Sequence, residues 1–426
     1  MLRPLDAFYA LAAGATAPIW MRKARGDWGE RFGKRPPLPR PERPRLMLHA
    51  VSVGEVGALR SLVPMLADEC DLVLSVGTDT GIERARSLFA DSCEVVRYPL
   101  DFSFAVRRFL DAVRPDAVAL VELEVWPEFA RMCRRRSIPV CVINGRLSRS
   151  SFRGYRRVSK ALGGRVVGEM FASLEFAAVQ DEIYAERFEA MGVAPNDCLI
   201  TGSMKWDAAP EAPAVPSRRA IELAGELGVD RSRPLVVGGS TAPGEEALLR
   251  DATPKGVQLL CAPRRPERFD EAFEALARDG ACARRSAGGP VAGAERFLLD
   301  SIGELGLAYE LADVVVVGRS FTMPGGSDPI EPIALGRATL CGPGMSNFEV
   351  IRDRLVAAGG LGVCDADGLA PTIAGLIADP ESRRAMAEAG RACVEASRGA
   401  SRRHAELLLG LLDAAAPARG AAAPAT

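Results

Sequence analysis

The sequence predicts an α/β protein made of two doubly wound parallel sheets, and three observations support this prediction. At 426 residues the chain exceeds the usual size of one domain. From Arg45 onward, short apolar segments alternate with amphipathic ones, and most apolar segments are rich in β-branched residues without polar alternation. That pattern is typical of strands covered on both faces. The rhythm stops at a Pro/Ala-rich stretch, 209–217, and then restarts.

The apolar segments divide the expected strands into two series. The first series comprises 45–52, 71–78, 94–100, 117–125, 139–144, 176–180 and 198–203, and the second comprises 235–240, 257–263, 296–301, 313–320 and 338–344. The resulting organisation is an N-terminal segment (1–40), a first Rossmann-like domain (41–208), a linker (209–217), a second Rossmann-like domain (218–380), a C-terminal helix (381–413) and a disordered tail (414–426).

The N-terminal segment combines an apolar stretch, 5–21, with a basic flank. Residues 1–45 contain ten Lys/Arg and four acidic residues, a net charge of 10 − 4 = +6. An apolar helix with such a flank suits insertion into, or docking on, an anionic cytoplasmic leaflet. A helix that packs on the protein core is the alternative reading of this segment.

Composition excludes several classes of function. The ten cysteines are scattered, and no two form C-x-x-C, which indicates buried thiols in a reducing compartment rather than disulfides or a zinc site. His49 and His404 are the only histidines, so no histidine-rich metal site is expected. A net charge of −1 with few aromatic residues does not favour nucleic acid as a partner.

Acidic residues follow two of the expected strands. Glu55 lies at a glycine turn where a helix begins, and the helix dipole there is expected to keep it ionised, as a general base requires. An acid placed there only to interact with the dipole is the alternative. Glu122 and Glu124 end the strand in VELEVWP, where pairing with arginines and a functional role are both open.

Basic residues follow other strands. The segment 144–160 carries six cations and no acid, and this favours an anionic partner such as a phosphorylated lipid for Arg146, Arg149 and Arg153. Lys205, also at a strand end, could neutralise a carboxylate or a phosphate, or form a surface salt bridge.

The second domain carries a candidate phosphate site. Arg264 and Arg265 follow a strand, and GGSDPIEPIALG (325–336) indicates a glycine turn leading into a helix. Backbone amides at a helix start can bind phosphate, and Glu331 could accept hydrogen bonds from ribose hydroxyls.

Together these motifs resemble those of bacterial 3-deoxy-D-manno-octulosonic acid (Kdo) transferases in order and spacing, from about residue 5 to residue 360. The resemblance implies the GT-B fold, with two Rossmann-like domains facing a cleft. It implies a CMP-Kdo donor bound by the second domain and a phosphorylated lipid A precursor as the acceptor of the first. It also implies a place on the cytoplasmic face of the inner membrane, anchored by the N-terminal segment, and neither a metal ion nor another cofactor.

Carried over by position, the resemblance makes Glu55 the general base, with Glu124 and Lys205 stabilising the transition state. The residues that it places against CMP are Arg264, Arg265, Ile302, Gly303, Glu304, Asp328, Pro329, Ile330 and Glu331.

Three departures from the family pattern lie on the donor side. Ala242 and Arg265 each stand where a histidine is usual, and Ser327–Asp328 replaces His-Asn. Two alternatives to Kdo transfer therefore stay open. One is another enzyme of the same fold, either a different lipid-directed glycosyltransferase or a nucleotide-sugar epimerase; the other is a non-catalytic carbohydrate- or nucleotide-binding relative.

Overall fold

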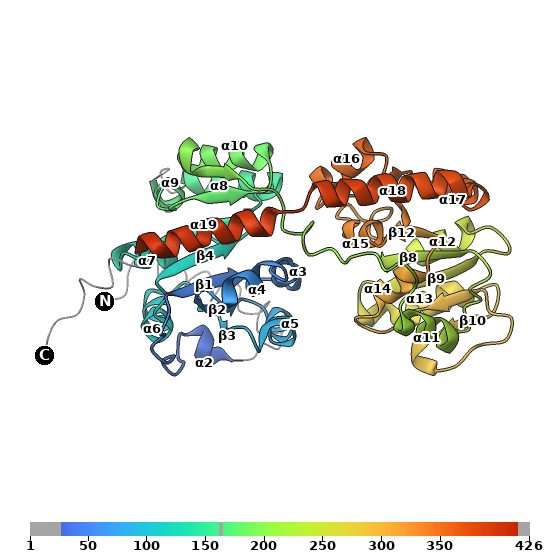
Figure 1. Ribbon diagram of the computed structural model, residues 1–426, viewed down its shortest axis with the longest axis horizontal. Coiled ribbons are helices and arrows are strands. Elements are labelled where there is room, and N and C mark those ends of the chain that lie inside the picture. The colour runs from blue at the N-terminus through green and yellow to red at the C-terminus, as the bar shows by residue number, and fades with distance from the viewer. Residues whose placement is uncertain (1–26, 162–164, 416–426) are drawn as a thin grey trace, which may run out of the picture. The chain divides into compact units, whose positions relative to one another are not determined.

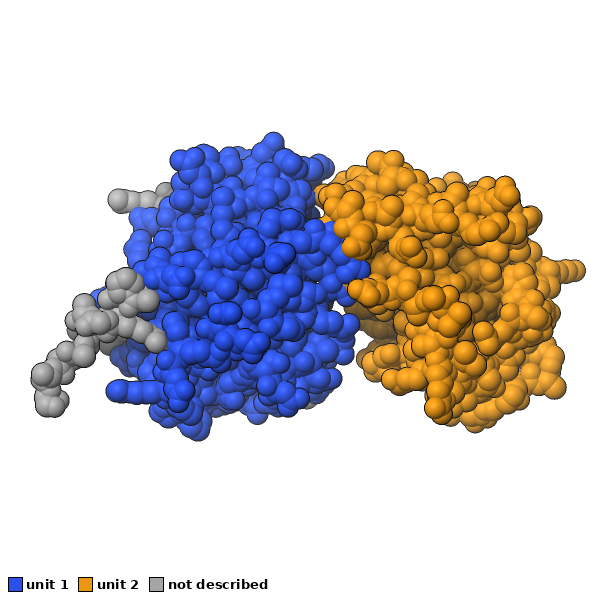
Figure 2. Space-filling view, in the orientation of Figure 1, with its two compact units in different colours: residues 1–208, 398–426 blue, residues 209–397 orange. Residues whose placement is uncertain are grey.

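The computed structural model describes residues 27–161 and 165–415 (Figure 1). The chain divides into two compact units, drawn in separate colours in Figure 2: unit 1 comprises 1–208 and 398–426, and unit 2 comprises 209–397. Each unit contains a seven-stranded sheet with helices on both faces, and the strand pairs described are all parallel. The predicted α/β class with two doubly wound sheets is confirmed.

The sheet of unit 1 has the order β3-β2-β1-β4-β5-β6-β7. Its strands are β1 (Arg45–Ala50), β2 (Asp71–Val76), β3 (Glu94–Arg97), β4 (Ala117–Val121), β5 (Val140–Gly145), β6 (Ala177–Val179) and β7 (Cys198–Ile200). Its helices are α2 (Trp28–Arg31), α3 (Val53–Ala58), α4 (Leu62–Ala67), α5 (Asp79–Phe89), α6 (Ser103–Val113), α7 (Pro127–Arg135), α8 (Arg149–Ala161), α9 (Arg165–Phe171), α10 (Glu182–Met191) and α19 (Ala400–Ala415).

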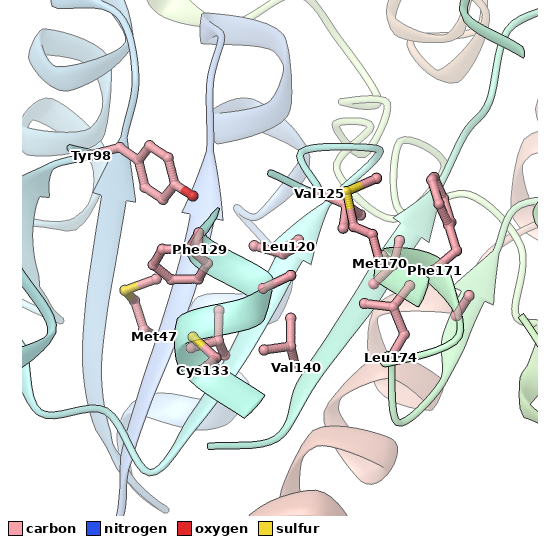
Figure 3. Close-up of a cluster of buried hydrophobic side chains, with 14 of the residues drawn as sticks. Met47, Tyr98, Leu120, Val125, Phe129, Cys133, Val140, Met170, Phe171 and Leu174 are labelled. Atoms are coloured by element: carbon pink, nitrogen blue, oxygen red, sulfur yellow. The ribbon is translucent and has the colours of Figure 1, made fainter. Parts of the chain in front are cut away.

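Both faces of this sheet are buried because its strands are apolar at successive positions. On β1, Met47 contributes to one core cluster, whereas Leu46 and Leu48 contribute to another on the opposite face. Figure 3 shows the first cluster, in which Met47 lies near Phe129 of α7. Helices α6, α7, α9 and α10 cover that face, and α3, α4, α5 and α19 cover the other.

The sheet of unit 2 has the order β10-β11-β9-β8-β12-β13-β14. Its strands are β8 (Leu235–Thr241), β9 (Gln258–Pro263), β10 (Cys282–Arg284), β11 (Arg296–Leu298), β12 (Val314–Val317), β13 (Ala338–Cys341) and β14 (Gly362–Val363). Its helices are α11 (Arg218–Leu227), α12 (Glu245–Ala252), α13 (Phe269–Ala277), α14 (Leu305–Leu311), α15 (Ile330–Ala334), α16 (Glu349–Ala357), α17 (Ala366–Ala378) and α18 (Pro380–Ala396). Strands β10 and β14 were not predicted, because neither lies in an apolar run rich in β-branched residues.

The segment 381–413, expected as one helix, forms two. Helix α18 ends at Ala396, and Gly399 has φ +100°, a left-handed conformation that interrupts the helical pattern. The Asp207 carboxylate then accepts hydrogen bonds from the backbone N–H groups of Gly399 and Ser401, at the start of α19. The break lets α19 rejoin unit 1, where Leu408 and other apolar residues enter the core.

The expected membrane anchor, 5–21, lies outside the described residues, as does most of the tail 414–426. Part of the basic flank is described, and several of its cations bind within unit 1. Arg31 pairs with Asp79 at 3.1 Å, and Arg45 with Asp71 at 2.5 Å, and both arginines are buried. Over 27–161 and 165–415, no helix is both long and apolar enough to cross a bilayer.

His49, on β1, is held as a buried neutral ring. Its ring stacks on Tyr98 with a centroid separation of 3.8 Å, and its Nδ1 lies 3.1 Å from the Ser75 carbonyl oxygen. Because that oxygen can only accept, Nδ1 carries the proton. Burial lowers the pKa of His49 to about 3, against which the Ser75 hydrogen bond acts only in part. The charged form is therefore excluded from the native state near neutral pH.

This burial predicts a pH-dependent loss of stability. Since the folded pKa lies below the unfolded value of 6.5, the unfolded chain takes up a proton first, and stability falls from pH 6.5 down to pH 3. When the pH falls from 7 to 5, His49 should lower the free energy of unfolding by about 2 kcal/mol. His49→Phe keeps the stacked ring. Between the same two pH values its free energy of unfolding, measured in urea, should fall by about 2 kcal/mol less than that of wild type. Equal losses of stability in the two proteins would contradict the assignment of His49 as a buried neutral ring. His404 is present in both proteins, so its contribution cancels.

Candidate functional site

The carboxyl ends of β1 and β4 bring the predicted acidic residues of unit 1 together. These strands pair directly, although β2 and β3 lie between them in the sequence, so their carboxyl ends form the topological switch point of the sheet. Ligands of doubly wound folds bind at this point. Glu55 follows β1, and Glu122 and Glu124 follow β4.

Glu55 and the N-cap residue Ser52 form reciprocal hydrogen bonds at the start of α3, in a variant of the capping box. The Ser52 hydroxyl accepts a hydrogen bond from the Glu55 backbone N–H at 3.3 Å and donates to Glu55 Oε1 at 2.8 Å. The Val51 backbone N–H donates to Oε2 at 2.7 Å. The carboxylate is therefore fixed in one orientation by two donors.

The pKa of Glu55 is raised to about 7. Burial is the largest cause, and the carboxylates of Glu122 and Glu124 raise it further, while the hydrogen bonds from Val51 and Ser52 lower it. Desolvation and two like charges therefore oppose the effect of the helix start, which was expected to favour the ionised form of Glu55. A carboxyl group with this pKa can accept and release a proton near neutral pH.

Glu122 joins the two predicted cations to this site. Its Oε2 lies 3.6 Å from Nη1 of Arg146, and its Oε1 lies 4.0 Å from Nζ of Lys205. Its backbone is left-handed, with φ 60°, and is held by hydrogen bonds from Glu122 N–H to the Ile143 carbonyl (3.0 Å) and from Arg146 N–H to the Glu122 carbonyl (3.2 Å). A non-glycine residue in this conformation is strained, as is common at functional sites.

Glu124 lies beside Glu122 and is also protonated more readily than usual. Burial and then the Glu122 charge raise its pKa, against the hydrogen bond that the Trp126 indole N–H donates at 3.0 Å. Burial and the charge of Glu124 raise the pKa of Tyr155, on α8, to about 12. Helix α8 therefore borders the acidic site.

Helix α19 fixes the loop that carries Lys205. His404 Nε2 accepts a hydrogen bond from Asn144 N–H at 2.8 Å, and Asn144 Oδ1 accepts one from Met204 N–H at 3.0 Å. Arg403 Nε donates to the Thr201 carbonyl at 2.9 Å. These contacts connect the end of β5, the end of β7 and α19, so the position of Lys205 depends on a helix that follows unit 2 in the sequence.

The three arginines expected to bind phosphate divide into two groups. Arg146 is half-buried and pairs with Glu122. Burial lowers the pKa of Arg146, but the Glu122 charge and the Tyr184 hydroxyl together raise it by more. Arg149 and Arg153 are exposed on α8, whose Phe152 and Tyr155 pack against the core. Within the described parts of the chain, no acidic side chain pairs with Arg149 or Arg153.

In unit 2, neighbouring strands place the predicted donor-binding residues together. Adjacent strands β11, β9, β8 and β12 end near Ile302, Arg264, Ala242 and Arg319, respectively. The Arg264 backbone N–H donates to the Thr241 carbonyl at 3.1 Å. Burial, Arg319 and Arg265 lower the pKa of the Arg264 guanidinium, whereas Tyr309 and Asp328 raise it.

Tyr309, on α14, is the buried centre of this group. A methyl group at Gly239 of β8 would lie 2.0 Å from the Tyr309 hydroxyl, so only glycine fits there. Burial, and then the charges of Glu331 and Asp328, raise the pKa of Tyr309 well above its usual range. Glu331 Oε1 would in turn lie 3.0 Å from a methyl group at Gly306 on the same helix.

The remaining predicted residues differ in their availability to a ligand. Ile302 is 83% exposed, and Gly303 has φ +92°. Glu304 is engaged, since Arg285 donates to its two oxygens at 3.1 and 3.2 Å and lowers its pKa against the effect of burial. Asp328 accepts a hydrogen bond from the Ile330 backbone N–H at 2.9 Å, and Pro329 caps α15.

Three positions of unit 2 were missed by sequence reasoning. Arg319, at the end of the strand 313–320, could have been found because it follows an apolar run as Arg264 does. Tyr309 and Glu245, whose carboxylate accepts a hydrogen bond from the Arg319 backbone N–H at 2.6 Å, gave no signal, since each occupies an ordinary position in a helical pattern. In the part of the chain that the structure describes, no group of three or more His, Cys, Asp or Glu side chains could hold a metal ion.

Comparisons with known proteins identify the family of the chain. Residues 26–208 match a family described as "3-Deoxy-D-manno-octulosonic-acid transferase (kdotransferase)". A 3-deoxy-D-manno-octulosonic acid transferase of Bordetella pertussis is 34% identical, over 94% of this chain and 98% of its own length. One from Haemophilus influenzae is 31% identical, over 86% of this chain and 87% of its own length.

Solved structures define the fold. A UDP-GlcNAc 2-epimerase from Neisseria meningitidis, 12% identical, aligns with a TM-score of 0.55 over 86% of this chain and all of its own. At this identity the likeness shows the GT-B fold alone and does not favour the epimerase alternative. The two transferases named above are 34% and 31% identical to this chain and align with 94% and 86% of it. The protein therefore belongs to the 3-deoxy-D-manno-octulosonic acid transferase family and is a glycosyltransferase.

Proposed function

We propose that the protein moves Kdo from CMP-Kdo to a phosphorylated lipid A precursor in lipopolysaccharide synthesis, with inversion at the anomeric carbon. The observation that carries this proposal is Glu55, a carboxyl group with a pKa of about 7 fixed at the switch point of unit 1. Inversion requires direct attack by an acceptor hydroxyl, and a base poised near neutral pH suits that attack.

In the proposed reaction the acceptor hydroxyl oxygen attacks the anomeric carbon, and its proton passes to Glu55. The bond from that carbon to the phosphate oxygen breaks, and CMP leaves with the electron pair. The hydrogen bonds from Val51 and Ser52 hold the Glu55 carboxylate in place during proton transfer. Lys205 and Glu124 stabilise the charges that develop, with Glu122 orienting Lys205.

The donor phosphate is proposed to bind in unit 2. Arg264 and Arg265 follow β9, and their positive charges suit a phosphate and neutralise its charge as CMP leaves. Guanidinium groups in this role make the reaction independent of a metal ion. The exposed Ile302–Gly303 turn and the 328–331 segment contact the nucleoside, where Glu331 accepts hydrogen bonds from ribose hydroxyls.

The acceptor is proposed to bind through its phosphate groups at α8. Arg149 and Arg153 are exposed, whereas Arg146 serves mainly to orient Glu122. With an N-terminal anchor on the cytoplasmic face of the inner membrane, this helix would meet phosphorylated lipid at the anionic surface.

The test is a transfer assay with the membrane-associated full chain. CMP-Kdo would be formed immediately beforehand, EDTA added, and a tetra-acylated lipid A precursor supplied. We expect mass spectrometry to show addition of one or more Kdo residues, with the opposite anomeric configuration to the donor by NMR. A folded protein that transfers nothing, or that needs added metal, would contradict the corresponding part of the proposal.

A further inference from the structure

We propose that Arg319 and Arg264 together form a phosphate-binding clamp in unit 2, with Arg319 as a further donor-binding residue. The inference rests on the proposed function. It gives a role to Arg319, which was not among the residues that the sequence placed at the donor site. Arg319 follows β12, and Arg264 follows β9; strand β8 pairs with both.

The backbone of Arg319 is held in a conformation that favours glycine. Its φ is 58°. The Arg319 N–H donates to Oε2 of the buried Glu245 at 2.6 Å, and its carbonyl accepts from Gly326 N–H at 2.8 Å. The backbone conformation disfavours arginine at this position, and such a residue points to a function for its side chain.

The side chain of Arg319 lies across the glycine turn that was predicted to bind the donor. A methyl group at Gly325 would lie 3.3 Å from Nη2 of Arg319 and 2.9 Å from Nδ2 of Asn347. The same turn contains Ser327, which is 7% exposed and whose hydroxyl has no hydrogen-bond partner among the described residues. A guanidinium and an unpartnered hydroxyl are thus present at one short loop.

Arg319 also adds to a concentration of positive charge. It is the like charge that lowers the pKa of Arg264 most, ahead of Arg265, and the acidic group that acts on Arg264 is Asp328. No acidic side chain in the described regions forms an ion pair with Arg264 or Arg319. Guanidinium groups that repel one another without such a partner are stabilised by a bound phosphate, which accepts hydrogen bonds from both.

The proposal makes Arg319→Gly an informative variant. Glycine removes the backbone strain and the repulsion, so the unfolding temperature should stay the same or rise. The affinity for CMP, by calorimetric titration of the full chain, should fall at least about tenfold, since one charged hydrogen-bonding partner is lost. Arg319→Lys, which keeps the charge but not the planar fork, should give an intermediate affinity.

Two controls separate the loss of the clamp from a general effect of relieving backbone strain. Ser137→Gly relieves a left-handed residue in unit 1 (φ 53°) and should leave CMP affinity unchanged. Inorganic phosphate serves as a second probe, and it should raise the unfolding temperature of wild type but not of Arg319→Gly.

The outcomes are distinguishable from failure of the proposed function. Wild type that binds phosphate through Arg319 but transfers no Kdo would support the clamp and overturn the donor assignment. Unchanged CMP affinity in Arg319→Gly, or a wild type protected by neither CMP nor phosphate, would overturn the clamp. A lower unfolding temperature for Arg319→Gly would assign Arg319 a structural role instead.

Discussion

Replacing Glu55 by Gln is expected to lower kcat for transfer by about 10²–10⁴-fold, the usual contribution of a general base. The substitution is suited to the test because Gln can keep the capping box with Ser52. The amide removes the proton acceptor while preserving the size of the side chain and the start of α3. Transfer would be measured by mass spectrometry over time, alongside the unfolding temperature.

The pH dependence gives a second measure of the same group. With a pKa of about 7 for Glu55, kcat/KM of wild type should fall as pH drops below 7, and the residual activity of Glu55→Gln should lack this limb. Because the folded pKa is raised above the unfolded value of 4.5, the stability contributed by this carboxyl is lost as pH rises from 4.5 through 7. The variant should therefore gain in stability relative to wild type at pH 8.

The matched control is Glu182→Gln, which changes an exposed acidic residue in the first turn of α10. It should retain wild-type kcat. If Glu55→Gln were equally active, Glu55 would be a helix cap only, and the base would have to be sought at Glu122 or Glu124.

Replacing Glu245 by Ala should destabilise unit 2 by at least about 4 kcal/mol, since a buried donor left without a partner costs about 1–3 kcal/mol. Glu245 is 1% exposed, and its carboxylate accepts backbone N–H groups from the ends of two strands. These donors are Ala242 (2.8 Å), Arg319 (2.6 Å), Ser320 (3.0 Å), Phe321 (3.0 Å) and Thr322 (3.4 Å). Alanine would leave all five without this acceptor.

Hydrogen exchange of the amides after β8 and β12 would measure this effect locally, because the chain has two units and global unfolding need not be two-state. CMP affinity should fall in parallel, since the Arg319 backbone loses its support. The control is Glu222→Ala, whose exposed pair with Arg218 on α11 (2.7 Å) should contribute less than about 1 kcal/mol. A cost below about 1 kcal/mol for Glu245→Ala would show that water replaces the carboxylate.

The sequence could predict which residues lie at the strand ends. Apolar runs without alternation located the main strands, and parallel strands bring their carboxyl ends to one edge, so Glu55 and Glu124 were expected at the ligand-binding edge. Their roles in catalysis came from the resemblance to Kdo transferases and stay predictions. The pKa of Glu55 was not predictable in the same way. It depends on burial and on two carboxylates from another strand, which lie 67 and 69 residues away in the sequence.

Backbone conformation explains most of the other differences. The left-handed backbone of Glu122 is held by hydrogen bonds with Ile143 and Arg146, at and after the end of β5. That of Arg319 is held by hydrogen bonds with Glu245 on α12 and with Gly326 in the loop that follows. The local sequence does not encode either set of contacts. The end of α18 depends on one glycine, Gly399, within a long helical pattern. Gly57, Gly225 and Gly390 lie inside helices, so a single glycine does not identify a helix end in advance.

The place of α19 in the sequence has a consequence for how the protein is made. During synthesis the whole of unit 2 leaves the ribosome after β1–β7 but before α19, which covers one face of their sheet with Leu408 and Leu412. Until then the part of that face that α19 covers stays exposed, and Asn144 and Thr201 lack the His404 and Arg403 contacts. Unit 2 can therefore complete its folding first, and the loop that carries Lys205 gains its contacts with α19 only once unit 2 has been translated.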